Sequence, residues 1–457
     1  MKALYTGIAA ILLMVFFACK KDSFIDSKDA LLTLSEDTLH FDTVFTSTGS
    51  ITQLFKIFNL NDQKLRLSEI KLMGGSTSNF KMNVDGAPGA NFSNIELAPN
   101  DSIYVFVSVT INPTTINLPF IVQDSILISY NGNSRFLQLE AYGQNAHFMK
   151  GKRVTTDSTW VNDLPYVILD SISVDNGTTL TIQKGCRIFH HANAPFQVNG
   201  SLKINGDSLD RVVFAADRLD PVYSDLPGSW PGIYFNTTSN NNILNFAVIK
   251  NAYQGIIAES SSGSGTKIIL NQCIIDNISD AGIVASGSSI SANNCLISNC
   301  GANVLLEAGG DYNFKHCTIV TFGNLFIDHK NPVLAITNKD ANGLVKPLNA
   351  AFNNCLIFGD YGSVNDEIVL DDSVAAIVSF NHCLYNSSNS TLSGTGNIVS
   401  QDPSFVLVDA SKREFNFRLL GTSPAINAGE NTTLMIDLDG KARSVGLKPD
   451  IGCYEFQ

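Results

Sequence analysis

Carboxylates are the residues with which this sequence could cleave a polysaccharide, because hydrolysis of a glycosidic bond needs two of them at a set separation. A phrase of six residues recurs between residues 244 and 385, and it offers two outward columns of side chains on neighbouring turns of the chain. The column just before the repeated cysteine contains no carboxylate, and the column three residues after it contains Asp276 alone. Since one carboxylate cannot act as both acid and base, the repeat predicts no assembled catalytic pair.

A second group of candidate residues lies in residues 218–230, where acidic and aromatic side chains could bind a sugar by hydrogen bonding and stacking. Asp220, Tyr223, Asp225 and Trp230 are the predicted glycan contacts. Trp230 has an alternative role, because it begins a Trp-x-Gly-Ile step in which the indole would plug the protein interior.

Three aspartates near the C-terminus, Asp437, Asp439 and Asp450, could hold Ca²⁺ through their oxygen atoms. The alternative that we favour is a tight turn in which Arg443 pairs with one of them. The repeated phrase brings no clustered histidines and no Cys-x-x-Cys spacing, so the sequence predicts neither a metal site nor a cofactor.

The repeated phrase also identifies the elements that must position these groups. Most copies share an asparagine two places before a cysteine, which Ala247 replaces in the first copy. Units of roughly 20 to 30 residues built from short β runs indicate a solenoid, in which each unit buries its apolar face against the next. The copies span residues 244–249, 270–275, 292–297, 314–319, 352–357 and 380–385.

Strand geometry assigns a side to each position of the phrase, since successive side chains point to opposite faces. The cysteines and the residues two places after them are predicted to be buried in stacked rows, the cysteines as reduced thiols. The asparagines are predicted to supply a bend before the cysteine and a ladder of amides along the stack. The predicted structural ladder consists of Asn271, Asn293, Asn353, Asn381, Cys273, Cys295, Cys317, Cys355 and Cys383.

The row that follows the cysteine is predicted to face outward and is mostly apolar, with Leu296, Leu356 and Leu384 among its members. An apolar row along several turns is larger than a soluble monomer normally leaves wet. We expect the N-terminal domain, an insertion at residues 328–348 or a partner chain to cover it. The polar residues before the cysteine, Asn294 among them, are also expected to point outward.

Residues 170–420 resemble the right-handed parallel β-helix repeat family. The string Trp-Pro-Gly-Ile at residues 230–233 is similar to the opening turns of bacterial members. The string Ser-Pro-Ala-Ile-Asn-Ala-Gly at residues 423–429 resembles a C-terminal module of the choice-of-anchor type, which closes the end of such helices. The resemblance implies a fold that hosts polysaccharide lyases and hydrolases as well as other functions, so the fold alone assigns no activity.

The first 19 residues resemble the signal peptide of a bacterial lipoprotein. Lys2 precedes an apolar run, and Phe16-Phe17-Ala18-Cys19 is similar to a lipobox, although Phe16 stands where leucine is usual. The resemblance implies that Cys19 becomes the lipidated first residue of the mature chain. An ordinary signal peptide or a transmembrane anchor is the alternative, and the apolar run is short for a spanning helix.

Composition and net charge limit the size of the core and the classes of partner that this chain can have. A chain of 457 residues, 44% of them hydrophobic, can bury a large core, and its net charge of −12 argues against nucleic acid as a partner. Short strand-like runs in residues 31–147 resemble an immunoglobulin-like sandwich, interpreted as a spacer or docking module. The expected domains are residues 1–19 (signal peptide), 20–30 (tether), 31–147 (sandwich), 148–169 (linker and N-terminal cap), 170–400 (β-helix) and 401–457 (capping module).

The expected fold class is all-β, a right-handed parallel β-helix preceded by an immunoglobulin-like β-sandwich. The favoured function is a protein lipid-anchored in the cell envelope, at the outer membrane of a Gram-negative bacterium. Its β-helix would bind a polysaccharide or another envelope protein without catalysis. The alternative is a polysaccharide lyase or glycoside hydrolase that acts on an acidic polysaccharide.

Overall fold

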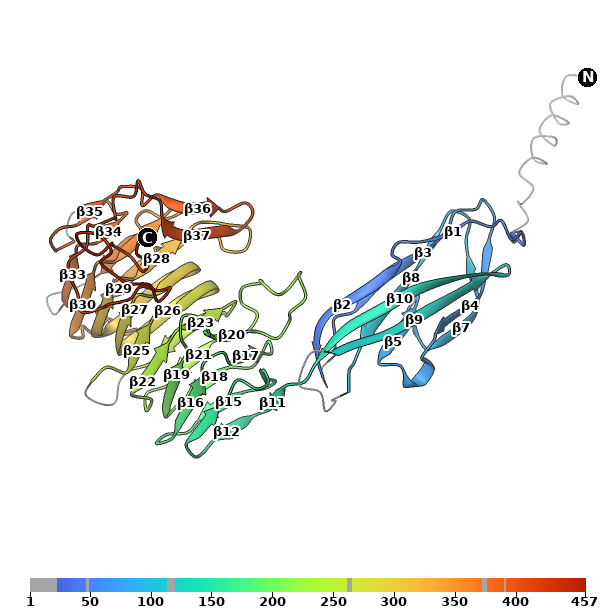
Figure 1. The fold of residues 1–457 in the computed structure, drawn as a ribbon, viewed down its shortest axis with the longest axis horizontal. Coiled ribbons are helices and arrows are strands. Elements are labelled where there is room, and N and C mark those ends of the chain that lie inside the picture. Colours follow the sequence, from blue (N-terminus) through green and yellow to red (C-terminus); the bar gives the residue numbers. More distant parts are fainter. Residues whose placement is uncertain (1–22, 47–48, 113–119, 261–264, 372–375, 390–391) are drawn as a thin grey trace, which may run out of the picture. The chain divides into compact units, whose positions relative to one another are not determined.

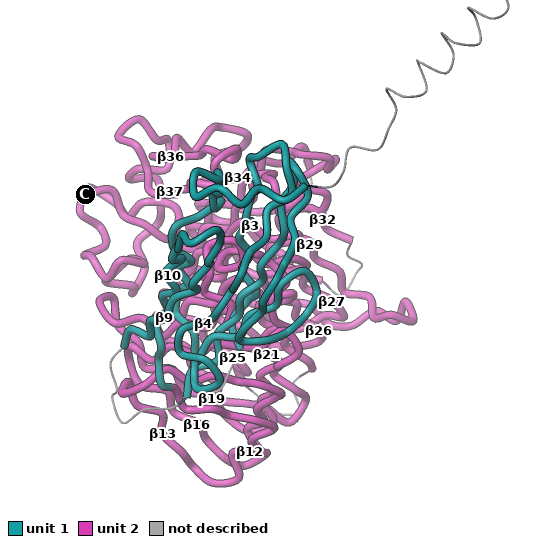
Figure 2. The backbone as a smooth tube through the Cα atoms, turned by 90° about the vertical axis from the view of Figure 1, so that its right-hand side faces the viewer, with its two compact units in different colours: residues 1–145 teal, residues 146–457 magenta. Residues whose placement is uncertain are grey.

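The computed structural model describes residues 23–46, 49–112, 120–260, 265–371, 376–389 and 392–457. Within these ranges the regular elements are strands and one 3-10 turn, η1 (Gly75–Thr77), so the protein is all-β as the sequence predicts. The chain divides into two compact units, residues 1–145 and 146–457, each with its own core (Figure 2). Among the described residues, no helix is long and apolar enough to span a membrane.

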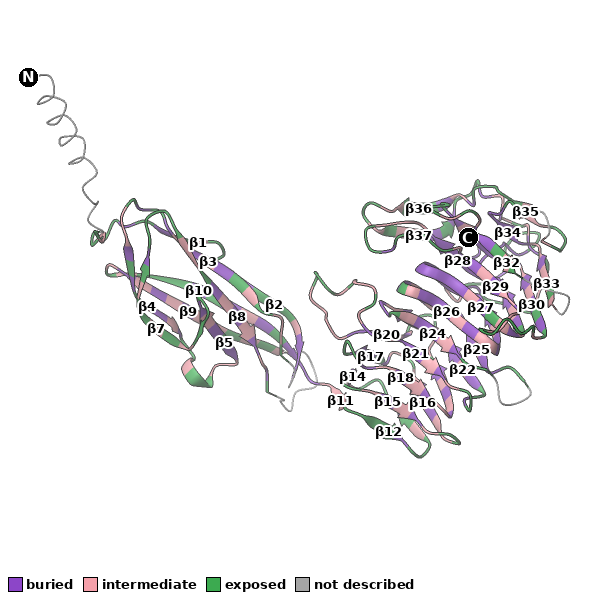
Figure 3. Cartoon of the chain, turned by 180° about the vertical axis from the view of Figure 1, so that it is seen from behind, coloured by how far each residue is buried: buried purple, intermediate pink, exposed green. Residues whose placement is uncertain are grey.

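The first unit, which we call the sandwich unit, consists of two five-stranded sheets with an apolar core between them (Figure 1). Alternate residues are buried in the longer strands β3, β4, β5 and β8, as expected for strands with one face on a core, and Figure 3 shows this alternation. The first sheet has the order β1 (Leu32–Leu34), β3 (Gln53–Asn59), β8 (Ser102–Val109), β5 (Phe80–Val84), β6 (Ala87–Pro88). The second has the order β2 (Thr38–Phe45), β10 (Asn133–Gln144), β9 (Phe120–Tyr130), β4 (Leu65–Leu72), β7 (Asn91–Leu97).

The second unit, which we call the helix unit, contains a single 25-stranded sheet that winds into a parallel β-helix. Its strands are β11 (His147–Met149), β12 (Lys152–Val154), β13 (Ser158–Trp160), β14 (Tyr166–Ile168), β15 (Ile172–Val174), β16 (Thr179–Gln183), β17 (Arg187–His190), β18 (Phe196–Val198), β19 (Ser201–Asn205), β20 (Val212–Ala216), β21 (Ile233–Phe235), β22 (Asn242–Asn245), β23 (Ala247–Lys250), β24 (Gln254–Ala258), β25 (Ile268–Asn271), β26 (Ile274–Asn293), β27 (Leu296–Lys315), β28 (Thr318–Thr321), β29 (Leu334–Thr337), β30 (Leu348–Asn353), β31 (Leu356–Gly359), β32 (Ile368–Asp371), β33 (Ala376–Asn381), β34 (Leu384–Tyr385) and β35 (Ile398–Val399). Each strand pairs in parallel with the strand one turn later, for example β16 with β19 and β19 with β22. This pairing confirms the predicted fold class.

A single inward-facing row of side chains contains the repeated cysteines. Strand register places each of them directly above the next, and all are fully buried. Burial raises the pKa of Cys273 and Cys295 well above the usual value, which keeps these thiols protonated and unreactive. The members of the row are Cys273, Cys295, Cys317, Cys355 and Cys383.

Cys186, whose place the sequence did not reveal, belongs to the same row. Register carries the row back from Cys273 through Ala247 and Val212 to Cys186. All eight cysteines among the described residues are free thiols. Each repeated thiol donates to a backbone carbonyl one turn earlier, as Cys295 does to Leu270 at 3.6 Å, so the cysteine fills a small apolar space and satisfies a buried acceptor.

The sharp bend of the phrase lies at the residue immediately before the cysteine. Gln272, Asn294 and His316 adopt left-handed backbone angles, with φ of 51°, 50° and 51°. The prediction that the asparagine two places before the cysteine forms the bend is therefore wrong, because that asparagine is the last residue of a strand.

The asparagines two places before the cysteine hydrogen-bond to one another along the stack. Asn293 Nδ2 donates to Asn271 Oδ1 at 2.9 Å, and Asn381 Nδ2 donates to Asn353 Oδ1 at 3.3 Å. Lys315 occupies this position in the copy between them, so the ladder consists of two segments. Each segment uses the amide as donor to one turn and acceptor from the other.

The apolar row after the cysteine is covered by residues 401–457, which we call the C-terminal module. The module contains an antiparallel hairpin, β36 (Phe405–Asp409) and β37 (Glu414–Leu419). Its apolar residues and the row form one buried cluster whose members include Leu296, Val320, Leu356, Leu384, Phe405, Phe417, Leu438 and Ile451. The insertion at residues 328–348, which the sequence suggested as a cover, instead supplies strand β29 to the stack.

A buried arginine anchors the C-terminal module to the β-helix. Arg443 donates to the side-chain oxygen of Asn294 at 2.7 Å, lies 2.9 Å from His316 Nδ1, and pairs with Glu455 at 3.3 Å. Asn294 points away from the interior of the stack as predicted, but the module buries it fully, and Arg443 pairs with Glu455 rather than with an aspartate as predicted. Burial lowers the pKa of His316 to about 2, and the charge of Arg443 acts in the same direction, so the imidazole is neutral.

Candidate functional site

Trp230, one of the predicted glycan contacts, lies in the interior of the helix unit. It is 1% exposed, its ring stacks on His190 with the centroids 4.1 Å apart, and its Nε1 donates to the carbonyl of Lys250 at 2.9 Å. A buried indole with a satisfied N–H group cannot contact a ligand, so the prediction of a glycan contact is wrong for this residue. Burial lowers the pKa of His190 to about 3, so the stacked imidazole is neutral.

The other three predicted glycan contacts lie in one loop but do not form one platform. The guanidinium of Arg218 lies 3.7 Å from the ring centroid of Tyr223, and its Nε lies 3.2 Å from Asp220. One face of the Tyr223 ring is therefore occupied by a cation. Asp225 pairs instead with Arg413 of the C-terminal module.

Two asparagines fix this loop on the β-helix. Asn251 and Asn277 donate to the backbone carbonyls of Ser224 and Asp225 at 2.8 and 3.0 Å. Asn277 also donates to Asn251 Oδ1 at 2.9 Å, so the two amides bridge consecutive turns. Both residues adopt left-handed backbone angles, which asparagine tolerates well. The loop is thus held in place over the edge of the stack.

Asp276, the only carboxylate of the two outward columns, lies beside this loop. Its Oδ1 accepts hydrogen bonds from Ser298 Oγ at 2.6 Å and from Asn299 Nδ2 at 3.2 Å. Burial raises the pKa of Asp276 against the effect of these two hydrogen bonds, and the nearby charge of Asp225 adds to the rise while Lys250 opposes it. The carboxyl group therefore has an increased proton affinity, which is the property of a general acid in glycoside hydrolysis.

The three C-terminal aspartates have separate local roles. Asp437 accepts from the backbone N–H of Lys441 at 2.9 Å and closes a tight turn. Asp439 pairs with Arg418 at 2.7 Å, and Asp450 accepts two backbone N–H groups of the module. In the part of the chain that the structure describes, no group of three histidine, cysteine or acidic side chains has the geometry to hold a metal ion.

A buried ionic cluster ties the insertion to the following turn. His329 Nδ1 lies 2.5 Å from Asp360, and its Nε2 lies 3.1 Å from Glu367, which is fully buried. Burial alone would lower the pKa of His329, but the two carboxylates raise it to about 9, so the ring is an imidazolium at neutral pH. Because an imidazolium carries a proton on each ring nitrogen and both nitrogens lie close to carboxylates, the cluster holds the fold together and offers no free lone pair.

A cleft of about 420 Å³ opens between the β-helix and the C-terminal module. We call it the aromatic cleft, and its lining residues are Phe322, Phe358, Asp402, Pro403, Ser404, Phe405, Val408 and Leu420. Phe322 follows β28 and Phe358 belongs to β31, so the two rings come from consecutive turns, with their centroids 6.4 Å apart. Phe405 of the hairpin lies at right angles to Phe322, with the centroids 6.4 Å apart. The hairpin that covers the apolar row therefore also forms one wall of the cleft.

The polar groups of the aromatic cleft come from residues 402–404. Asp402 Oδ1 accepts from the backbone N–H of Ser404 at 2.7 Å, which orients the carboxylate, and the residue is exposed. Aromatic rings pack against the apolar faces of sugars, and carboxylate oxygens accept hydrogen bonds from sugar hydroxyls. The arrangement suits a neutral sugar residue better than an acidic one, because Asp402 would repel a second carboxylate.

Sequence reasoning missed the aromatic cleft because its residues come from distant segments and lie outside the repeated phrase. The available signal was the concentration of phenylalanines in the C-terminal hairpin, Phe405, Phe415 and Phe417, which is high for a segment of that length. The predicted lipidation site, Cys19, lies outside the described residues, and anchoring stays a prediction.

No known protein family and no curated protein matches the chain. Among solved structures, the chain is similar to pectate lyase Pel9A at 13% identity and a TM-score of 0.32, over 68% of this chain and 88% of the lyase. It is also similar to a family 123 glycoside hydrolase from Clostridium perfringens, at 12% identity and a TM-score of 0.18, over 25% of this chain and 26% of the hydrolase. The VesB protease of Vibrio cholerae matches at 15% identity and a TM-score of 0.18, over 25% of this chain and 31% of the protease. The chain thus spans about a quarter to a third of the hydrolase and the protease, and likenesses at these TM-scores assign no activity.

Proposed function

We propose that this protein is a lipid-anchored protein of the cell envelope that binds a glycan through the aromatic cleft of its helix unit, without cleaving it. The observation that carries the proposal is the cleft itself, in which Phe322 and Phe358 stand beside the exposed carboxylate of Asp402. Apolar ring faces next to a few oriented polar groups are the usual composition of a small-ligand site.

The ligand that fits this chemistry is a glycan with neutral sugar residues. Its C–H faces would pack on the exposed parts of the two phenylalanine rings, chiefly on Phe358, because Phe322 already stacks on Phe415 and Phe417 of the hairpin. The glycan hydroxyls would donate to Asp402. A protein partner would also find apolar surface here, because Val408 and Leu420 are exposed at 37% and 44%. Glycan binding is the better fit because a lone carboxylate in a cleft lined by aromatic rings matches hydroxyl donors, whereas protein interfaces exclude unpaired charge from their centres.

The test is a glycan-array screen of the full chain, followed by titration of each hit into variants. Asp402→Asn removes the charge but keeps the acceptor for the Ser404 N–H, and it should weaken binding about tenfold, as expected for loss of a charge-assisted hydrogen bond. Phe322→Ala should weaken binding at least as much. Tyr253→Ala is the matched control, because this exposed aromatic residue of the helix unit does not line the cleft. Unchanged binding in Asp402→Asn and Phe322→Ala would contradict the proposal.

Anchoring is tested separately at Cys19. If Cys19 is lipidated, Cys19→Ser should release the protein from the membrane fraction or leave its precursor unprocessed. A variant that remains in the membrane fraction and is cleaved at the same place would show that another anchor holds it.

A second candidate function, cleavage of an acidic polysaccharide, is favoured by the raised pKa of Asp276. The neighbouring Asp225 would be the second carboxylate of a hydrolase pair, although it pairs with Arg413. Incubation with uronate polymers, followed by detection of new reducing or unsaturated ends, distinguishes the candidates. Product that disappears in Asp276→Asn would favour cleavage, and the absence of product with any polymer would favour binding alone.

A further inference from the structure

The outer face of the first sheet of the sandwich unit carries a second group of aromatic and polar side chains. β8 lies between β3 and β5, and register sets Phe106 beside Leu54 on one side and Asn83 on the other. In the same way, Tyr104 lies beside Lys56, and Ser108 lies beside Lys81. These residues form a grid on the side of the sheet that faces away from the core.

This face is apolar at its centre and is left uncovered by the described residues of the sandwich unit. The Tyr104 and Phe106 rings stack with their centroids 6.1 Å apart and their planes 14° from parallel. Leu54 and Tyr104 are 45% and 40% exposed. Stacked rings that stand on a flat sheet present a rigid surface, which loses little conformational entropy when a ligand binds.

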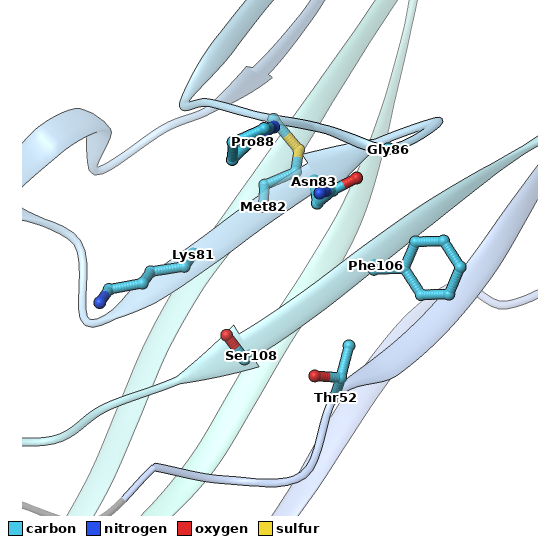
Figure 4. A pocket seen from close by; sticks show the side chains of 8 residues that line it. All are labelled: Thr52, Lys81, Met82, Asn83, Gly86, Pro88, Phe106 and Ser108. Carbon is cyan, nitrogen blue, oxygen red and sulfur yellow. The ribbon is translucent and has the colours of Figure 1, made fainter.

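A cleft of about 430 Å³ lies at one end of this face (Figure 4). Figure 4 shows the side chains that line it, Thr52, Lys81, Met82, Asn83, Gly86, Pro88, Phe106 and Ser108. Phe106, Met82 and Pro88 form its apolar part, and the hydroxyl, amide and ammonium groups of Thr52, Ser108, Asn83 and Lys81 form its polar part. The mixture provides one stacking surface and several hydrogen-bonding groups within the reach of one sugar residue.

The charge of the face distinguishes it from the aromatic cleft. None of the residues that line this cleft of the sandwich unit is acidic. Lys81 forms no ion pair with a described residue. Lys56 lies 4.6 Å from the ring centroid of Tyr104, which adds a second positive charge to the grid. Asp85 immediately precedes Gly86 of the lining, but at about 3.3 Å per residue of strand it lies roughly 13 Å along the strand from Lys81. Lys81 is therefore available to an anion.

One polar atom of the cleft lacks a partner. Asn83 Oδ1 is shielded from solvent and accepts no hydrogen bond from the described residues. A shielded acceptor without a donor costs free energy, which a ligand hydroxyl that donates to it would recover after a small rotation of the amide. The orphaned acceptor thus points to a ligand with hydroxyl groups, and the lysine points to one with a negative charge.

We propose that this face is a binding site for an acidic glycan, with a uronate residue in the cleft and the next sugar residues lying over Phe106 and Tyr104. The uronate carboxylate pairs with Lys81, a hydroxyl donates to Asn83, and the apolar sugar faces pack on the rings. The site goes beyond the proposed function, because it lies in another unit, rests on other residues and takes an acidic rather than a neutral glycan.

The experiment is calorimetric titration of the detergent-solubilised full chain with short fragments of polygalacturonate, alginate and hyaluronan, and with a neutral glucan fragment. Phe106→Ala should weaken binding of the acidic ligand about tenfold or more, as expected for loss of a stacking partner. Lys81→Met keeps the aliphatic stem and should weaken binding to a similar extent, whereas Lys81→Arg should retain it. Binding should also weaken as salt is raised, because the Lys81 pair is exposed.

Two controls separate this site from the rest of the molecule. Phe136→Ala removes an exposed aromatic residue of the other sheet of the same unit and should leave binding unchanged. Asp402→Asn in the aromatic cleft should leave acidic-glycan binding unchanged, so failure of the proposed function would not affect this result. The inference is overturned if none of the three acidic fragments binds, or if one binds equally well to Phe106→Ala and Lys81→Met. A tighter complex with the neutral glucan would overturn it as well.

Discussion

Both units place apolar side chains on the outer face of a sheet, but they treat them differently. In the helix unit, Leu356 and its neighbours are covered by the C-terminal module, and Leu356 is 1% exposed. In the sandwich unit, Leu54 and the aromatic pair beside it have no such cover among the described residues. A chain that seals one apolar row with residues 401–457 and leaves another open within its own unit indicates that the open one has a separate use.

The two cores also differ in the residue types that fill them. The sandwich core consists of aliphatic and aromatic residues with the alternation of antiparallel strands. The core of the helix unit adds a row of thiols, and it also encloses the neutral imidazole of His190. The helix unit should therefore respond to pH in ways that the sandwich unit does not.

The largest expected effect comes from charging the two apolar rows in turn. Leu356→Asp would bury a carboxylate without a partner and should destabilise the helix unit by about 3 to 5 kcal/mol. Leu54→Asp, on the open face, should change stability by less than about 0.5 kcal/mol. Differential scanning calorimetry of the full chain measures both substitutions, and tryptophan fluorescence identifies the transition of the helix unit, because both tryptophans of the chain, Trp160 and Trp230, belong to it. Equal effects of the two substitutions would remove the contrast between the rows.

The second largest effect is expected from acid, which should destabilise the helix unit more than the sandwich unit. The pKa of His190 is lowered to about 3 in the folded protein and is about 6.5 in an unfolded chain, so the unfolded state binds the extra proton between these values. The contribution of His190 to the stability of the helix unit is therefore fully present above about pH 6.5 and falls by about 4 to 5 kcal/mol toward pH 3, and His316, whose folded-state pKa is lowered to about 2, adds a loss of the same sign. His190→Phe should reduce this loss. If tryptophan fluorescence shows no acid-induced loss of stability in the unsubstituted protein, the account is contradicted.

His329 gives stability a pH dependence of the opposite sign to that of His190. The folded-state pKa of His329 is raised to about 9, so the stabilisation from its imidazolium is fully present below pH 6.5 and is lost as pH rises through about 9. Fluorescence-detected unfolding at pH 7 and pH 10 should show this loss, and His329→Gln should be less stable at pH 7 but less sensitive to the change. An identical pH dependence in His329→Gln would assign the loss to other groups.

A smaller effect is expected from the asparagine ladder. Asn293→Ala removes the hydrogen bond to Asn271 and should cost about 1 kcal/mol, which is typical of a single partly buried hydrogen bond. Asn313→Ala is the comparison, since this asparagine lies in β27 outside the ladder position and its buried Oδ1 accepts no hydrogen bond from the described residues, so its removal should cost less. The midpoint of urea unfolding measures both, and a cost at Asn293 no greater than at Asn313 would show that the ladder adds little.

The smallest effect should come from the exposed ion pair between Asp225, in the loop of residues 218–230, and Arg413 of the C-terminal module. Asp225→Asn removes the ion pair with Arg413, in which the aspartate side chain is 54% exposed, and should change stability by less than about 0.5 kcal/mol. The melting temperature should therefore stay almost constant. A large decrease would mean that the pair, rather than Asn251 and Asn277, holds the loop.

Periodicity in the sequence was sufficient to predict the stacked strands and the parity that buries Cys295 and Ile297, because both follow from local alternation along one strand. The position of the bend, at Asn294 rather than Asn293, could not be predicted, since either asparagine tolerates left-handed angles. The cover over Leu356 could not be predicted either, because it depends on where residues 401–457 fold back along the stack.

The candidate sites were less accessible to sequence reasoning for a related reason. Trp230 looked like a sugar platform because local sequence does not reveal which side of the stack an indole occupies. The aromatic cleft joins Phe322 to Phe405 across a large separation in the chain. Tyr104 and Phe106 could have been noticed, because β8 carries apolar residues at both parities, which is unusual for a strand with one wet face.

The central claim is that the surfaces left open by this fold bind glycans, and hydrogen exchange in the presence of an array-selected neutral glycan tests it most directly. We expect amide protection to increase in residues 320–326, 356–359 and 402–408, which line the aromatic cleft, and to remain unchanged in β26, on turns outside the cleft. Absence of any bound glycan, or protection that increases elsewhere and leaves these three segments unchanged, would contradict the claim.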